Sequence, residues 1–224
     1  MLSFHFLTTQ CKKNNLDSLK ELRKPIIFIK ARHNKSSAVK VSAEEFGGLF
    51  PNLYLCIGAR VMLTRNLWVS KGLCNGSMGY VVDVVYSEGF ETPSLPVAVI
   101  VQFDGYTGPS FFEKERCVPI IPVTSAVDIS GNILERQQIP LKLAWAITIH
   151  KAQGLTLNKA WVDIGKKECF DGLTYVALSR VRNLKDMIIQ PFPFERIGNI
   201  NKSKAFSFRK EEENRLHTLS VRLN

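Results

Sequence analysis

The sequence predicts an α/β fold in which a parallel sheet is interrupted by a small, inserted antiparallel β-barrel. Short segments rich in Val and Ile, separated by Gly, Pro, Ser and Asp, fill residues 72–139, and this texture is typical of a small barrel. Strands alternate with short helices on both sides of that segment, as in α/β domains. The 224 residues are 45% hydrophobic, which is enough to bury a core.

The first elements are a helix and two strands. The helix is expected over residues 15–24, where leucines recur at every third position and Asp17 is a candidate cap. Pro25 ends this helix, because proline cannot continue the hydrogen-bond ladder. Strands are expected at residues 26–33 and 58–65.

The barrel and the return to the sheet follow. Barrel strands are expected at residues 79–89, 95–105, 117–123 and 133–141. The apolar run at 141–149 predicts one buried parallel strand. Strands at 159–164 and 186–190 and a helix at 173–180 complete the sheet domain. The expected domains are residues 1–71 with 140–195, the inserted barrel at 72–139, and a basic, charged helical tail at 196–224.

Charge and cysteine usage narrow the partners and the compartment. The net charge of +10 and pI near 9.5 favour a polyanion such as nucleic acid, although a basic protein without such a partner is the alternative. The five cysteines are odd in number and far apart, which indicates reduced thiols in a nuclear or cytosolic protein. No apolar run reaches the roughly 18 residues of a membrane span, and the start does not resemble a signal peptide, so we expect neither a membrane partner nor secretion.

The segment TIHKAQGLT, residues 148–156, is the first candidate site. Thr148 can cap a short helix after the buried strand, and Gly154 suits the left-handed position that ends it. Beside His150 and Lys151, the free N–H groups of this helix start would seat a phosphate of DNA. The alternative is a plain strand–turn–helix with solvated side chains.

Arg180, with Arg182 nearby, is the second candidate. Arg180 is expected on the apolar face of the 173–180 helix, where its guanidinium would suit the charge of a transferring phosphoryl group. The alternative is an arginine that only bonds the last helix carbonyls.

Aromatic and polar residues after the 58–65 strand form a third candidate. Asn66 and Trp68 follow the strand end, where Trp68 could stack on a base or pack between domains. Trp145 and Trp161 lie in predicted buried strands and are expected in the core. The basic stretches 23–35 and 202–210 are more typical of solvated faces.

Complete catalytic sets are missing from the sequence. It contains no G-x-x-x-x-G-K-[ST] loop to hold phosphates and no strand that ends in an Asp-Glu pair. It has no zinc-ligand spacing and no hydrolase triad motif. The chain by itself is therefore expected to be catalytically inactive.

Three segments resemble one family, the Pif1-like DNA helicases, which are the 5′-to-3′ branch of superfamily 1. LKLAWAITIHKAQGLTL resembles their motif V, and FDGLTYVALSRVRNL resembles their motif VI. GARVMLTRNLWVSKGLCNGSMGYVVDVVY is similar to the segment that leaves their second RecA-like domain and begins a Src-homology-3-like barrel. The resemblance covers about residues 15–195 and implies a RecA-like parallel-sheet domain with that barrel inserted.

The resemblance also implies roles for single residues. Thr148 and His150 match positions that touch the backbone of single-stranded DNA. Gln153 and Gly154 match positions that face the nucleotide cleft. Arg180 matches the arginine that reaches the γ-phosphate of ATP.

What the resemblance implies for function depends on a second half. ATP and Mg²⁺ would bind only together with the N-terminal RecA-like domain, because that domain carries the Walker A and Walker B residues of the family. The expected function is the C-terminal half of an ATP-dependent helicase in DNA unwinding, repair, recombination or telomere maintenance, with single-stranded DNA as partner. The chain would then be a fragment, a truncated gene model, or a decayed copy of the kind that Helitron-type mobile elements leave behind. The alternatives are a non-enzymatic single-stranded nucleic-acid-binding module and a barrel-based protein-interaction domain.

Overall fold

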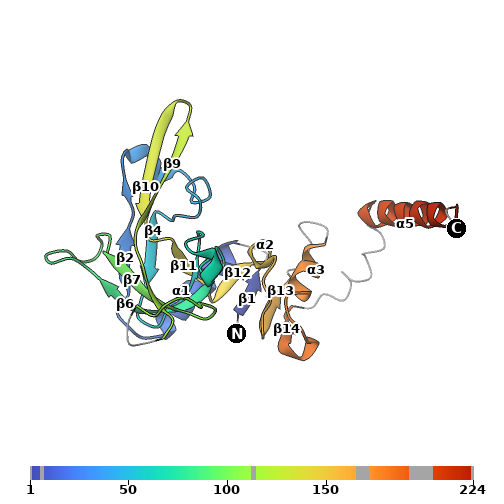
Figure 1. Cartoon of the computed structure of the whole chain (residues 1–224), viewed down its shortest axis with the longest axis horizontal. Helices are drawn as coiled ribbons and strands as arrows, with labels where there is room; N and C mark the ends of the chain where they lie inside the picture. The colour runs from blue at the N-terminus through green and yellow to red at the C-terminus, as the bar shows by residue number, and fades with distance from the viewer. Residues whose placement is uncertain (1, 6–7, 112–114, 165–171, 192–203, 223–224) are drawn as a thin grey trace. The chain divides into compact units, whose positions relative to one another are not determined.

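The computed structural model describes residues 2–5, 8–111, 115–164, 172–191 and 204–222 (Figure 1). Its packing divides the chain into two compact units. One is the parallel-sheet unit, residues 1–10 and 147–224, and the other is the strand-rich unit, residues 11–146.

The parallel-sheet unit contains a four-stranded sheet in the order β12-β1-β13-β14. Its strands are β12 (Ala146–Thr148), β1 (Leu2–His5), β13 (Ala160–Asp163) and β14 (Met187–Ile189). β13 pairs in parallel with both β1 and β14, so the predicted α/β fold class is confirmed. The helices are α2 (Ile149–Ala152), α3 (Leu173–Leu178) and α5 (Lys204–Arg222), with a short 3-10 helix at Leu184–Asp186.

β1 was not predicted, although it lies inside the sheet. The sequence LSFH is short and stands at the start of the chain, where no flanking turn marks it as a strand. Its register against β13, from Leu2 with Ala160 to His5 with Asp163, supplies the pairing that local sequence does not reveal.

The strand-rich unit is built from antiparallel pairs. The largest sheet has the order β11-β5-β6-β7-β8. Its strands are β11 (Leu141–Leu143), β5 (Arg60–Leu63), β6 (Met78–Val85), β7 (Ala98–Phe103) and β8 (Cys117–Ile120). The expected strands are confirmed with shorter bounds. In this strand order β11 and β8 are edges, so closure into a Src-homology-3-like barrel stays a prediction.

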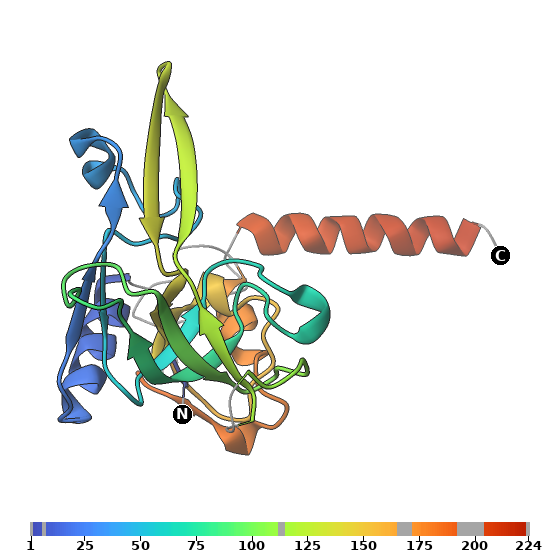
Figure 2. The same cartoon turned by 60° about the vertical axis from the view of Figure 1, so that its left-hand side comes forward.

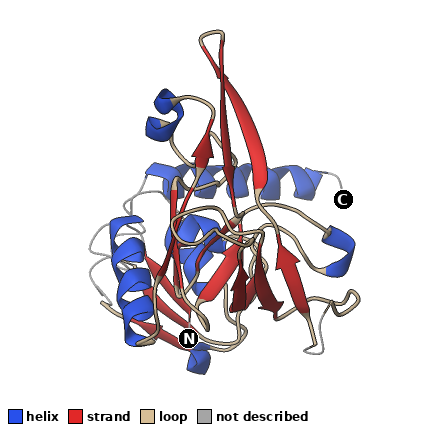
Figure 3. Ribbon diagram, turned by 90° about the vertical axis from the view of Figure 1, so that its left-hand side faces the viewer, coloured by secondary structure: helices blue, strands red, loops and turns tan. Residues whose placement is uncertain are grey.

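Two smaller sheets complete this unit. β9 (Val123–Ile129) and β10 (Asn132–Gln138) form a long hairpin, and β3 (Arg32–His33) pairs with β10 (Figure 2). The hairpin extends well past the neighbouring strands (Figure 3). β2 (Ile27–Lys30) pairs with β4 (Asn52–Leu55).

The core of the strand-rich unit explains why these strands stay together. Its buried aliphatic and aromatic side chains come from α1 (Thr8–Glu21) and from strands of two sheets, including Leu19, Ile29, Leu55, Val61, Val101 and Phe103. Burial of several such side chains, each worth roughly 1.5–3 kcal/mol, dominates the stability of a unit of this size.

The predicted strand over 141–149 is wrong as one element. The segment forms β11, which pairs antiparallel with β5, and then β12 of the other sheet. Between them, the side chain of Asn15 accepts hydrogen bonds from the backbone N–H groups of Trp145 and Ala146, at 2.9 Å each, and donates to the carbonyl of Ala146 at 2.8 Å. An amide side chain therefore occupies the backbone groups that a partner strand would use.

The helices differ from expectation mainly in their bounds. α1 begins at Thr8 rather than at residue 15, so Asp17 lies inside the helix and the predicted cap is wrong. The helix ends at Glu21, ahead of Pro25, as expected. The helical tail is confirmed over Lys204–Arg222, while the predicted tail residues 196–203 lie outside the described residues.

The compact units divide the chain at other places than the predicted domains. Residues 11–71 pack with the strands up to Ala146 rather than with the parallel sheet, and the boundary falls inside β12. Units defined by compact packing need not match evolutionary domains, so the predicted domain boundaries stay a prediction.

Candidate nucleic-acid and phosphate site

The turn after β12 is built as the sequence indicates. Ile149 and Ala152 are fully buried and anchor α2, while His150, Lys151 and Gln153 are exposed. The helix is a single turn, held by its two buried residues and followed at once by Gln153 and Gly154.

Gly154 ends this turn in the left-handed conformation, with a φ of +82°. That confirms the predicted role of Gly154, because residues with a side chain rarely adopt this conformation. Thr148 stands at the position before the helix, but its side chain makes no capping hydrogen bond. The predicted Thr148 cap is therefore right in position and wrong in contact.

Arg180 lies beyond the end of α3, not on its apolar face. The helix ends at Leu178, with Ser179 as its cap. Arg180 folds back: its Nε donates to the carbonyl of Val176 at 2.7 Å, and its Nη2 donates to Ser179 Oγ at 2.6 Å. The prediction that Arg180 shares the helix face is wrong, and its contact with a last-turn carbonyl is the one expected of an arginine at a helix C-terminus.

The two candidates nevertheless meet. Nη1 of Arg180 donates to the carbonyl of Leu155, the residue after Gly154, at 3.3 Å. The backbone of Arg180 accepts a hydrogen bond from the N–H of Leu157 at 2.8 Å, and Leu157 forms a parallel bridge with Val181. α2 and α3 also pack against each other. The turn and the arginine are thus joined directly.

The guanidinium of Arg180 keeps capacity for an anion. The side chain is half-buried, and three of its N–H groups have the partners named above. An arginine carries five donors, so two remain without a partner among the described residues. Arg182 and Lys151, both exposed, add positive charge to the same unit.

Asn66 and Trp68 belong to the strand-rich unit. Asn66 Oδ1 accepts a hydrogen bond from the N–H of Asn75 at 2.7 Å, which closes the loop that follows β5. Trp68 is 41% exposed and its backbone is paired with Leu73 on both sides. A role for either residue in DNA binding stays a prediction.

The other two tryptophans differ in how deeply they are buried. Trp145 is half-buried and packs on the core of the strand-rich unit, as predicted. Trp161 is 37% exposed, so its predicted place in the core is wrong. β13 buries Ala160 and Val162 instead, because alternate residues of a strand point to opposite faces.

Sequence reasoning missed a polar pair at the ends of β1 and β13. Nδ1 of His5 lies 3.2 Å from Oδ2 of Asp163, and the His5 ring contacts the Trp161 ring edge-on. His5 is buried. The alternation of LSFHF is the signal that could have placed β1, and with it His5.

No metal site or membrane span is found in the described part of the chain. None of its His, Cys, Asp and Glu side chains gather in a group of three or more that could hold a metal ion. Its helices are all too short or too polar to cross a bilayer. None of the four described cysteines, Cys11, Cys56, Cys74 and Cys117, forms a disulfide bond, and Cys169 lies outside the described residues.

Comparison with known proteins gives one family throughout. Residues 50–84 match the family described as DNA helicase Pif1, 2B domain. The chain is 37% identical over 165 residues to the ATP-dependent DNA helicase PIF1 of Danio rerio, covering 73% of this chain and 23% of that protein. It is 39% identical over 140 residues to the human ATP-dependent DNA helicase PIF1, covering 62% of this chain and 19% of that protein. The chain thus spans about a fifth to a quarter of these relatives.

Solved structures agree in fold. The Pif1 helicase of Candida albicans superposes with a TM-score of 0.71 at 24% identity, over 96% of this chain and 49% of that one. The Pif1 of a Bacteroides species, solved in complex with ADP-AlF4, has a TM-score of 0.57 at 26% identity, over 93% of this chain and 45% of that one. In sequence and in fold, the chain therefore corresponds to the C-terminal part of a Pif1-like helicase of superfamily 1B.

Proposed function

We propose that the chain is the C-terminal half of an ATP-dependent 5′-to-3′ DNA helicase, which grips single-stranded DNA and presents Arg180 to ATP. The observation that carries this proposal is the direct joining of the 148–154 turn to Arg180 through Leu155 and Leu157. A DNA phosphate would bind at the turn and an ATP phosphate would bind at Arg180. Both would then contact the same short, hydrogen-bonded segment. The names of the relatives and the net charge of +10 support the same function.

The mechanism follows from what these residues can hold. Lys151 is exposed beside Thr148, and the N–H groups at the start of α2 lie next to both, so a DNA phosphate would find a cation and neutral donors there. The two remaining donors of Arg180 would take the oxygens of a γ-phosphoryl group held by a first RecA-like domain. Gln153 and Gly154 lie between these two contacts in the chain, so movement at one would be transmitted to the other. A chain with this function would act on DNA, and its site of action would be the nucleus.

The test is binding of a fluorescent oligothymidine to the full chain, followed by fluorescence anisotropy. We expect affinity to fall steeply between roughly 50 and 200 mM salt, because bound counterions are released. Lys151→Glu is expected to weaken binding about tenfold, since it removes a phosphate contact and adds repulsion. The matched control is Lys185→Glu, the same charge change at an exposed position on the 3-10 helix of the same unit.

Two outcomes would count against the proposal. Equal weakening by Lys151→Glu and Lys185→Glu would show that only net charge matters. No binding at low salt would remove every nucleic-acid function and leave the protein-interaction alternative. A non-enzymatic nucleic-acid-binding module is the second candidate, favoured by the lack of a phosphate-binding loop in the sequence.

A further inference from the structure

The outward face of β2 continues into β3 as a row of aromatic and basic side chains. Ile29 and Ala31 are buried, whereas Phe28 is half-buried and Lys30 and Arg32 are exposed. Because alternate residues of a strand share a face, Phe28 and Lys30 lie on the outward face of β2, roughly 6.6–6.8 Å apart along the strand. Arg32 follows in β3, so a second exposed cation lies a short distance further along the chain.

An aromatic pair marks one end of this row. Phe28 pairs across the sheet with Tyr54 of β4, and their rings stack with centroids 5.0 Å apart and planes 19° apart. Tyr54 is 41% exposed. The pair is therefore a rigid apolar surface open to solvent on a sheet face that also carries cations.

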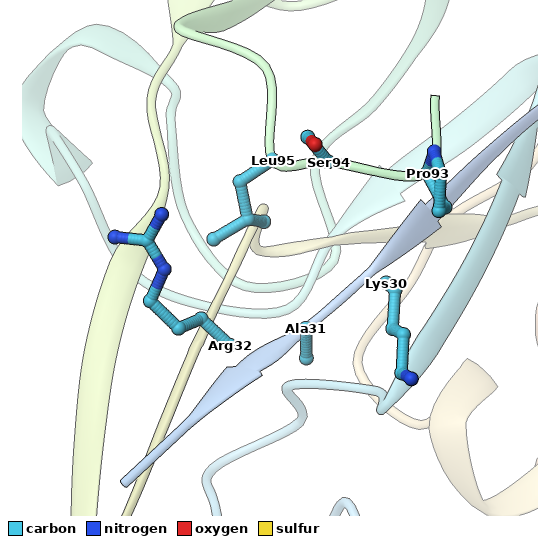
Figure 4. Close-up of a pocket in the computed structure, with 6 residues that line it drawn as sticks. All are labelled: Lys30, Ala31, Arg32, Pro93, Ser94 and Leu95. Atoms are coloured by element: carbon cyan, nitrogen blue, oxygen red, sulfur yellow. The ribbon is translucent and has the colours of Figure 1, made fainter. Parts of the chain in front are cut away.

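A hollow of about 270 Å³ marks the other end. It is lined by Lys30, Ala31 and Arg32 and by the loop Pro93, Ser94 and Leu95 (Figure 4). Lys30 lies on the Pro93 side and Arg32 on the Leu95 side, with Ala31 between them. The two cations thus stand at separate positions along the hollow, rather than around one point.

The segment that carries this surface is strongly positive, and no described residue forms an ion pair with its cations. Residues 20–40 contain seven lysine and arginine residues against one acidic residue, Glu21. All seven are exposed, and none forms an ion pair with another described residue. They are Lys20, Arg23, Lys24, Lys30, Arg32, Lys35 and Lys40.

Protection of a sheet edge does not explain these cations. Charged side chains often guard edge strands against aggregation, but β2 has neighbours on both edges. β4 pairs with one edge. On the other, the N–H of Lys30 donates to the carbonyl of Pro93 at 2.8 Å, and Thr92 Oγ1 donates to the carbonyl of Phe28.

We propose that this surface, made of Phe28, Lys30 and Tyr54 of the β2–β4 sheet and Arg32 of β3 with the 93–95 loop, is a second binding surface for single-stranded nucleic acid. Lys30 and Arg32 hold successive phosphates, and the Phe28–Tyr54 pair stacks on a base. Single strands are favoured over duplexes because only an unpaired base offers its face to an aromatic ring. The surface lies wholly in the strand-rich unit and does not depend on the 148–154 turn.

The first test is oligothymidine binding by the full chain carrying Lys30→Glu and Arg32→Glu. We expect affinity at low salt to fall at least about tenfold, and the slope of log affinity against log salt to become shallower by about 1.4, or about 0.7 for each lost phosphate contact. The control is Lys12→Glu with Lys13→Glu, an equal charge change at two exposed positions of α1. An equal loss in the control pair would overturn the proposal, because net charge alone would then explain binding.

The second test addresses the stacking. Tyr54→Leu keeps an apolar side chain and removes the ring, and it is expected to weaken oligothymidine binding about tenfold while duplex binding changes little. Unchanged oligothymidine binding in Tyr54→Leu, or equal affinity of the native chain for duplex and single strand, would reject the single-stranded surface. Thermal unfolding of each variant verifies that it folds.

These tests separate the surface from the proposed helicase function. If Lys151→Glu weakens binding and the Lys30, Arg32 double variant does not, the second surface is wrong and the turn remains the binding site. If the reverse holds, the surface stands and the function proposed for the turn is wrong. Binding of the native chain to anionic phosphatidylserine vesicles, lost in the same double variant and stronger than oligothymidine binding, would assign the face to lipid and overturn the proposal.

Discussion

Arg136 is fully buried in the strand-rich unit and forms no ion pair with a described residue. Its guanidinium donates to the carbonyls of Ala38, Val41 and Leu49 at 2.6–2.9 Å and lies 4.3 Å from the centre of the Phe46 ring. Burial lowers the pKa of this group from its ordinary value. The buried charge of Arg136 is tolerated because carbonyl dipoles and the face of an aromatic ring replace its hydration shell. The same contacts hold the irregular segment 38–49 against β10.

His33 completes that cluster and makes it sensitive to pH. Nε of Arg136 donates to Nε2 of His33 at 3.0 Å, so this nitrogen must be unprotonated. The pKa of His33 is lowered from its ordinary value of 6.5, first by burial and then by the charges of Arg136 and Lys30, against an opposing hydrogen bond to Ala31. Below an ordinary histidine pKa the unfolded chain binds a proton that the folded chain resists.

We therefore expect the free energy of unfolding to fall as the pH drops from about 7.5 to about 5. His33→Gln keeps an acceptor for Arg136 that does not titrate, so the fall should become smaller while stability at pH 7.5 changes by less than about 1 kcal/mol. Urea denaturation of both proteins across this pH range measures the difference. His5, His150 and His217 stay in both proteins and cancel. Parallel pH profiles would show that His33 is not the titrating group.

At the scale of elements, prediction succeeded where a pattern is local and failed where a distant residue decides. The strands expected at 79–89, 95–105 and 117–123 follow from their own Val and Ile residues, and Gly154 from its own backbone freedom, whereas β9 was not expected. The run at 141–149 looks like one strand, because nothing nearby shows that Asn15 will take its middle backbone groups. Arg180 fails for a local reason, since the exact end of a helix is hard to place from sequence and the guanidinium folds back on the last turn.

Asn15 is accordingly expected to stabilise the junction of β11 and β12. Asn15→Ala leaves the N–H groups of Trp145 and Ala146 without their acceptor and should cost about 2–4 kcal/mol. Asn15→Asp keeps that acceptor but buries a charge and places a carboxylate oxygen against the Ala146 carbonyl, so at neutral pH its loss should be at least as large. Urea unfolding of the three proteins measures both losses. Either variant being as stable as the native chain would contradict the assigned contacts.

At the scale of the whole molecule, composition and the order of the motifs indicated the fold class and the family. They did not indicate which segments pack together into each compact unit. Residues 11–71 were expected with the parallel sheet and instead pack with the strands that follow, because Leu19 and Ile29 join their apolar cluster. The meeting of the turn and Arg180 was expected only from the resemblance, and the bonds through Leu155 and Leu157 give it a physical basis. The chain spans 23% of the Danio rerio relative, so the partners of the whole protein stay a proposal.

The last prediction concerns ATP and the whole motor. The isolated chain should hydrolyse ATP no faster than a buffer blank, because its sequence has no loop to hold the phosphates. Fusion of the first RecA-like domain of the Danio rerio relative before residue 1 should restore hydrolysis that single-stranded DNA stimulates. Arg180→Ala in the fusion should reduce the turnover rate by a factor of roughly 10³ or more, while oligothymidine binding stays within about twofold, because Arg180 is proposed to bind the γ-phosphate of ATP rather than DNA. The control is Arg182→Ala, a nearby exposed arginine whose loss should leave turnover largely intact.

Two outcomes would contradict this prediction. ATP turnover by the isolated chain that disappears with Arg180→Ala would show that the chain carries a complete ATP site. Turnover of the fusion that does not change with Arg180→Ala would leave the nucleic-acid-binding module as the better description.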